Sequence, residues 1–317
     1  MESAAQAQSA VPVKKTGVMR RGWALTKSSW HVWRLDKELT ALPLISFLVS
    51  LVVIIPFIAI FLLTSDLSAT KESLQSSSGA QLQSTLAGWQ QAGLVLIVMF
   101  LSTLIANFFS GAVIYGAVQR FRGGDPTVKT SLSGAARKFR PLILFSLMMT
   151  TVGFILQFLE ERLPLAGRIA TYLFDAAWNI ANIFAIPVIV LSEESISPLQ
   201  ATRKSVEIIK KVWGEGIIVN IGIGLIGALS FMIYALTVLL AAGLVYGATG
   251  AVSAPLFVVG AVGITGAIGL MLIFSTLSAI AKAALYQYAV TGEAPASFNK
   301  ELLRSSMTHK KASKIFK

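Results

Sequence analysis

A stripe of polar side chains crosses one long apolar segment of the chain, and it is the first place where chemistry could occur. The segment runs from Arg168 to Leu191, and the 3.6-residue period of a helix places four polar residues on one face of it: Thr171, Asp175, Asn179 and Asn182. A carboxyl group in such a segment must face protein or water rather than lipid. Asp175 could relay a proton in a transporter, or the stripe could join helices through hydrogen bonds.

The rest of the sequence favours the second interpretation. A proton relay would need a charged partner for Asp175 in another apolar segment, and the polar residues there are neutral: Asn107, Tyr115, Gln157, Asn220 and Tyr234. Both histidines, His31 and His309, lie in polar flanking segments. We therefore expect the stripe to be an intramembrane polar packing site.

No other pattern indicates catalysis. The chain contains no cysteine, which excludes disulfides, thiolate metal sites and cysteine nucleophiles. The ends of the apolar segments show no pair of carboxylates with a basic partner, no serine in a nucleophile turn and no metal-ligand spacing. We therefore predict no catalytic residue, no metal and no cofactor, and a protein that is not an enzyme.

Glycines recur in two of the apolar segments. A literal GxGxxG pattern begins at Gly222, but it lies inside an apolar segment rather than at a strand-to-helix turn, so it does not indicate a dinucleotide site. Small residues at regular spacing let two helices approach closely. The sequence thus predicts tight packing between two spans at Gly222, Gly224, Gly227, Gly260, Gly263, Gly266 and Gly269.

The composition defines the elements that carry these residues. With 55% hydrophobic and 13% charged residues, and a mean hydropathy of +0.71, the chain is typical of a polytopic membrane protein. We predict an all-α membrane domain over residues 17–300, after a disordered tail at 1–16 and before a basic tail at 301–317. Its six spans are predicted at residues 42–63, 94–118, 141–159, 169–191, 217–246 and 255–277.

Basic residues are distributed unequally between the connecting segments. Of the 27 Lys and Arg residues, only Lys71, Arg162 and Arg168 fall on one side of the predicted spans. By the positive-inside rule, both termini are expected in the cytoplasm, and the protein in the plasma (inner) membrane. This asymmetry already accounts for the net charge of +12, so nucleic acid is not an expected partner. On the opposite side, ion pairs are expected at the turn formed by Glu160, Glu161, Arg162 and Arg168.

An amphipathic segment precedes each pair of spans. These segments cover residues 17–40, a helix capped by Asp125 and a helix that begins at Ser197-Pro198. The third has an apolar face and a charged face, and the apolar face carries Leu199, Thr202, Val206, Ile209 and Trp213. We predict three two-span hairpins, each preceded by a helix in the membrane interface with these headgroup contacts: Arg20, Arg21, Trp23, Lys27, Trp30, Trp33, Arg34, Arg137, Lys138, Arg140, Arg203, Lys204, Lys210, Lys211 and Trp213.

Several longer motifs carry a resemblance to known proteins. Three of these motifs are GGDPT at 123–127, LEERLPLAGR at 159–168 and AWNIANIFAIPVIVLSEE at 177–194. With them the chain resembles an uncharacterised family of prokaryotic six-span membrane proteins. More loosely, it is similar to the membrane domain of bacterial glycerophosphodiester phosphodiesterases, whose catalytic barrel is absent here. The resemblance implies a six-span fold and no activity, and the family usually has a small apolar residue at the position of Asp175.

Two functions remain in view. The favoured one is a noncatalytic membrane protein that binds anionic lipids, a partner membrane complex or a second copy of itself through its basic cytoplasmic helices. The alternative is a transporter or channel for a small or lipidic solute that uses the polar stripe of the fourth span.

Overall fold

The computed structural model is helical wherever it describes secondary structure. It describes residues 18–36, 38–64, 79–211, 216–252, 254–295 and 298. The predicted tails at 1–16 and 301–317 lie outside these residues. The helices are α1 (Val18–Leu35), α2 (Glu38–Thr64), α4 (Gly79–Phe121), α5 (Val128–Ala136), α6 (Phe139–Arg162), α7 (Leu165–Ala181), α8 (Ala185–Leu191), α9 (Pro198–Lys211), α10 (Gly216–Thr249) and α11 (Ala254–Thr291).

Six stretches of helix are long and apolar enough to cross a membrane, which confirms the predicted number of spans. They lie in α2, α4, α6, α7 with α8, α10 and α11. Two of these helices extend furthest beyond the predicted spans, because α4 begins at Gly79 and α11 continues to Thr291. In both helices, the part beyond the purely apolar span is formed by a mixture of small and apolar residues.

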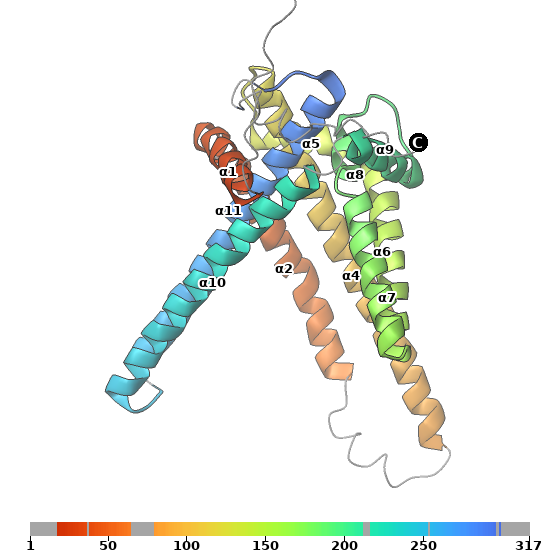
Figure 1. The fold of residues 1–317 in the computed structure, drawn as a ribbon. Coiled ribbons are helices and arrows are strands. Elements are labelled where there is room, and N and C mark those ends of the chain that lie inside the picture. Colours follow the sequence, from red (N-terminus) through yellow and green to blue (C-terminus); the bar gives the residue numbers. More distant parts are fainter. Residues whose placement is uncertain are drawn as a thin grey trace, which may run out of the picture.

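The helices converge at one end of the molecule and diverge at the other (Figure 1). We call the convergent end the capped end, because α1, α5, α8 and α9 lie there with the last turns of α11. The largest fully buried side chains include residues from five elements at this end: Leu39, Leu42, Ile114, Leu142, Ile189, Ile280 and Leu285. Towards the divergent end the spans expose apolar side chains such as Val52 and Leu244, as suits contact with lipid. The protein core is therefore concentrated at the capped end.

The first helix is shorter than the 17–40 segment predicted. α1 ends at Leu35, Asp36 is not helical, and α2 begins at Glu38. Across the break, the indole N–H of Trp33 donates to the hydroxyl of Thr40. α1 packs against α10 and α11, the last two helices that the structure describes.

The fourth span is interrupted. α7 ends at Ala181, a turn occupies 182–184, and α8 continues to Leu191. The backbone N–H of Asn182 bonds to the carbonyls of both Trp178 and Asn179, and that of Ala185 bonds to Asn182, so the chain tightens here before the second helix begins.

α9 packs against this interruption. Its buried residues are Ala201, Ser205, Ile208 and Ile209, whereas Leu199 is 62% exposed. Small side chains at 201 and 205 let α9 approach the turn closely. At its start, the Ser197 hydroxyl accepts from the Gln200 N–H, and the Gln200 side chain accepts from the Ser197 N–H, so the predicted Ser-Pro start is confirmed.

Candidate anion-binding site

A pocket of about 520 Å³ opens at the capped end between the last turns of α4, the α5–α6 turn and the end of α8. We call it the basic pocket. Polar and charged residues form most of its wall: Tyr115, Gln119, Arg122, Arg137, Lys138, Ser192 and Glu193.

Three cationic side chains and one carboxylate lie in this wall: Arg122, Arg137, Lys138 and Glu193. The Lys138 ammonium donates to the backbone carbonyls of Glu193 at 3.0 Å and Glu194 at 3.1 Å, which ties the start of α6 to the segment after α8. Arg122 and Arg137 are exposed, and neither forms an ion pair within the part of the chain that the structure describes. Two guanidinium groups are thus free to receive an anion from solution or from a membrane surface.

Close contact between α4 and α5 shapes the pocket floor. A Cβ atom on Gly134 would lie 2.4 Å from the ring of Tyr115, and one on Gly116 would lie 2.5 Å from the Ser131 hydroxyl. Only glycine allows these two helices to lie so near each other. The side-chain oxygen of Gln119, one turn further along α4, is buried without a hydrogen-bond partner among the described residues. This oxygen can accept a hydrogen bond from a hydroxyl group of a ligand.

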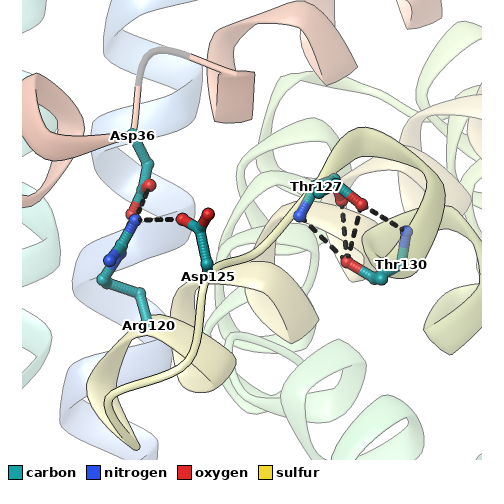
Figure 2. Close-up of polar contacts among 5 residues, drawn as sticks. All are labelled: Asp36, Arg120, Asp125, Thr127 and Thr130. Carbon is teal, nitrogen blue, oxygen red and sulfur yellow. Dashed lines mark hydrogen bonds and ion pairs between the residues drawn. The ribbon is translucent and has the colours of Figure 1, made fainter.

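An ion-pair cluster holds the α4 end of the pocket in place. The Arg120 guanidinium donates through two nitrogens to Asp36, and its Nη2 also reaches Asp125 at 2.8 Å (Figure 2). The Asp36 side chain is only 6% exposed, whereas that of Asp125 is 87% exposed. The cluster therefore links the break after α1 to the end of α4 and to the loop that leads into α5.

α5 begins with a cap that differs from the predicted one. Thr127, not Asp125, is the residue that caps the helix: its hydroxyl accepts from the Thr130 N–H at 3.2 Å, and the Thr130 hydroxyl accepts from the Thr127 N–H at 2.9 Å (Figure 2). The prediction for Asp125 is wrong because Arg120 engages its carboxylate. The reciprocal pair fixes the start of the helix that carries Gly134.

Side chains of α9 satisfy the backbone at the interruption of the fourth span. The buried Ser205 hydroxyl accepts from the Phe184 N–H at 3.1 Å, and the Thr202 hydroxyl donates to the Asn182 side chain at 2.7 Å. The first bond pairs a backbone N–H that the turn leaves without an intrahelical partner, and the second joins two side chains across the contact. They also fix α8, whose end forms one wall of the basic pocket.

The polar stripe of the fourth span does not form a single cluster. Asp175 and Asn179 are exposed, Thr171 is partly buried and Asn182 is buried. Three of the four side chains bond locally: Thr171 donates to the Arg168 carbonyl, Asn179 to the Asp175 carbonyl and Asn182 to the Trp178 carbonyl. Within the single chain, the expected packing against another helix is seen only for Asn182.

The turn between α6 and α7 shows other contacts than the expected ion pairs. The Arg162 guanidinium lies 4.2 Å from the centre of the Phe158 ring, and Arg168 donates to the Leu163 carbonyl at 3.2 Å. Among the side chains described at this turn, Glu160 pairs with neither arginine. The side chain of Glu161 lies outside the described residues.

The predicted headgroup residues lie on several elements of the capped end. Their described charged side chains are exposed on α1, around the α5–α6 turn and on α9, except for Lys138, which is partly buried: Lys27, Arg34, Arg137, Arg140, Arg203, Lys204 and Lys210. Trp23 is exposed, while Trp30 and Trp33 are partly buried, with their ring centres 4.4 Å apart and their planes tilted by 42°. The side chains of Arg20, Arg21 and Lys211, and all of Trp213, lie outside the described residues.

The predicted packing glycines fall into two groups. In the first group, an added Cβ atom would press against a side chain of the facing helix: Gly227 against Phe274, Gly263 against Val238, and Gly266 against Tyr234. In the second group, an added Cβ atom would meet open space: Gly224, Gly260 and Gly269. The surroundings of Gly222 lie outside the described residues. α10 and α11 thus approach closely along part of the predicted ridge only.

Sequence reasoning missed most of the basic pocket. Four of its residues could not be recognised as one site from the sequence, because they come from separate segments that only the fold brings together: Tyr115, Gln119, Arg122 and Ser192. The adjacent Arg137-Lys138 pair was identified, but as part of a diffuse basic face. Among the described residues, no group of three or more His, Asp or Glu side chains is placed to hold a metal ion.

Fold and site together define a helical multi-pass membrane protein with a basic pocket at one end. The chain belongs to a family of unknown function, DUF6159, whose model matches residues 91–296. The match covers the basic pocket and the spans from α4 to α11, but not α1 or α2. No curated protein and no solved structure matches the chain, so the likeness to phosphodiesterase membrane domains rests on the quoted motifs alone.

Proposed function

We propose that this protein is a noncatalytic membrane protein that binds the phosphate of an anionic lipid in the basic pocket. In this proposal the capped end faces the cytoplasm, in accordance with the distribution of basic residues. The single observation that carries the proposal is the convergence of Arg122, Arg137 and Lys138 on one pocket with a single opposing carboxylate.

The arrangement suits a phosphate group in both charge and geometry. A guanidinium group offers a planar pair of donors that matches two phosphate oxygens, and two such groups are unpaired here. Tyr115, Gln119 and Ser192 add neutral hydrogen-bonding groups for a glycerol or sugar headgroup. A lipid is preferred to a free anion because the pocket lies directly at the ends of the spans, where headgroups gather.

Neighbouring helices support a position at the membrane surface. α1 and α9 expose large apolar side chains at the capped end, with Trp23 and Leu199 both 62% exposed. Beside them, Lys27, Arg34, Arg203 and Lys204 are exposed. We infer that α1, α5 and α9 are amphipathic helices that lie in the interface, each followed by a two-span hairpin.

The decisive experiment compares two charge-matched double variants. Purified full-length protein in detergent is titrated with phosphatidylglycerol in mixed micelles with phosphatidylcholine, and the bound lipid is measured by native mass spectrometry. Arg122→Gln with Arg137→Gln removes two pocket charges, each contributing about 1 kcal/mol, so binding should weaken about 30-fold. Arg203→Gln with Lys204→Gln removes the same charge from the interface face of α9, outside the pocket, where each solvent-screened contact contributes about 0.5 kcal/mol, so binding should weaken only about fivefold.

Equal losses in the two double variants would contradict the pocket and point to a diffuse basic surface. A second arm adds inorganic phosphate in detergent without lipid. If inorganic phosphate binds as tightly as phosphatidylglycerol, the ligand is a soluble anion and the lipid proposal fails.

A further inference from the structure

A second cavity lies within the membrane-spanning part, between α2, α4 and α11. Its volume is about 470 Å³. Aliphatic and aromatic side chains line most of it, and four serines interrupt them. We call it the hydroxyl groove, after Ser46 and Ser50 of α2, Ser110 of α4 and Ser275 of α11.

The groove and the basic pocket lie on opposite sides of α4. The groove is lined by Ala106, Phe109, Ser110 and Val113, and the pocket by Tyr115, Val118 and Gln119. At about 100° per residue, the centres of these two sets are roughly 180° apart around the helix. One lipid cannot occupy both, so the groove is a separate site and does not rest on the proposed function.

Along α2 the groove extends from just below the capped end past the middle of the span. At its upper end, Pro43 lies five residues after Glu38, or about 8 Å along α2. At its lower end, Ile58 lies fifteen residues further on, or about 22 Å. This length exceeds one leaflet, which is about half of a hydrocarbon core of roughly 30 Å, so the groove can hold an acyl chain from the level of the lipid esters to beyond the midplane.

The serine hydroxyls of the groove have no hydrogen-bond partner within the described part of the chain. Hydroxyl groups in these spans commonly bond to the carbonyl four residues earlier, as Ser102, Thr265 and Thr276 do. Ser275, next to Thr276, makes no such bond. A hydroxyl without a partner in a hydrocarbon environment costs free energy, so these serines can be stabilised by donating a hydrogen bond to a polar group of a ligand.

A cation stands above the groove on the same face of α11. Lys282 follows Ser275 by seven residues, which places it about 10 Å nearer the capped end and only about 20° away around the helix. It is partly buried, and no acidic side chain among the described residues pairs with it. The groove and Lys282 therefore match the parts of a phospholipid in order. The apolar wall faces the acyl chain, the free hydroxyls face the ester groups, and the cation faces the phosphate.

We propose that the hydroxyl groove holds one acyl chain of an anionic phospholipid from the leaflet at the capped end. The ester oxygens accept hydrogen bonds from the serines, and the phosphate pairs with Lys282. The chain fills space between α11 and the α2–α4 pair.

Photo-crosslinking of a lipid tail tests this site. Full-length protein is placed in phosphatidylcholine nanodiscs with a small fraction of phosphatidylglycerol that carries a photoactivatable acyl chain, and cross-linked peptides are located by mass spectrometry. Cross-links are expected at the groove residues of α2, α4 and α11. Ser275→Phe, which fills the groove, should reduce them about tenfold, whereas Thr237→Phe at an exposed position of α10 should not.

Milder variants guard against misfolding. Replacing Ser46, Ser110 and Ser275 together by Ala keeps the groove open but removes hydroxyls, and Lys282→Gln removes the cation. Each should lower the number of phosphatidylglycerol molecules retained in native mass spectrometry, while Lys129→Gln on the exposed face of α5 should not. Cross-links spread evenly along all six spans, or retention unchanged in both variants, would overturn the proposal. Arg122→Gln with Arg137→Gln should leave the groove cross-links intact.

Discussion

Arg120 and Asp36 are joined by two hydrogen bonds although 84 residues separate them. Asp36 is almost fully buried at the break between α1 and α2, and Arg120 stands in the last turn of α4. This pair fixes the first helix of the chain to the wall of the basic pocket, and it gives the first prediction.

Asp36→Asn should destabilise the protein by about 3 kcal/mol, because it leaves the Arg120 guanidinium without its buried partner. Asp125→Asn removes the exposed partner and should cost less than about 1 kcal/mol. Thermal unfolding of the detergent-solubilised protein measures both. Equal effects of the two variants would mean that the burial of Asp36 contributes nothing.

Gly134→Ala should destabilise the capped end by about 1–3 kcal/mol, since the new methyl group would overlap the Tyr115 ring. The displaced ring should also reduce phosphatidylglycerol binding in the basic pocket. Gly153→Ala in α6 is the matched control, because nothing lies within 4 Å of the position of its Cβ. That control should be neutral or slightly stabilising, since alanine favours helix.

Ser205→Ala removes the acceptor for the buried Phe184 N–H at the interruption of the fourth span. Leaving this donor unpaired should cost about 1–3 kcal/mol and speed hydrogen exchange at the start of α8. Hydrogen–deuterium exchange with mass spectrometry checks this against Ser133→Ala, which lies exposed on α5. Unchanged exchange in Ser205→Ala would show that the bond does not hold the turn.

Tyr234→Phe should loosen the contact between α10 and α11. The phenol donates to the carbonyls of Val262 at 3.0 Å and Gly263 at 3.2 Å, and an interhelical bond in a membrane is worth about 0.6–1.7 kcal/mol. Thermal unfolding should show this loss, while Tyr246→Phe, at an exposed position, should have almost no effect. A larger loss in the control would contradict the role of the phenol.

Hydropathy predicted the number of spans and their order, because an apolar stretch of about 20 residues has few alternatives to crossing a bilayer. It could not predict the interruption at Asn182. That residue has helical spacing from Asp175 and Asn179, and the turn depends on Thr202 and Ser205 of α9, a helix whose position the sequence does not reveal.

The capping residues show a similar limit. Asp125 and Thr127 are both good helix caps by residue type. Which of them caps α5 is decided by Arg120, which takes the Asp125 carboxylate. The residues of α9 that pack against the protein show the same limit, because the turn of the fourth span contacts the small residues Ala201 and Ser205, which the sequence pattern does not single out. Contacts between distant segments, not local pattern, decide these details.

The position of α1 constrains the order in which the protein can be assembled. Asp36, directly after α1, pairs with Arg120 in the second span, and the helices that α1 packs against, α10 and α11, lie far downstream in the chain. α1 can therefore reach its observed position only after α10 and α11 have been synthesised and inserted.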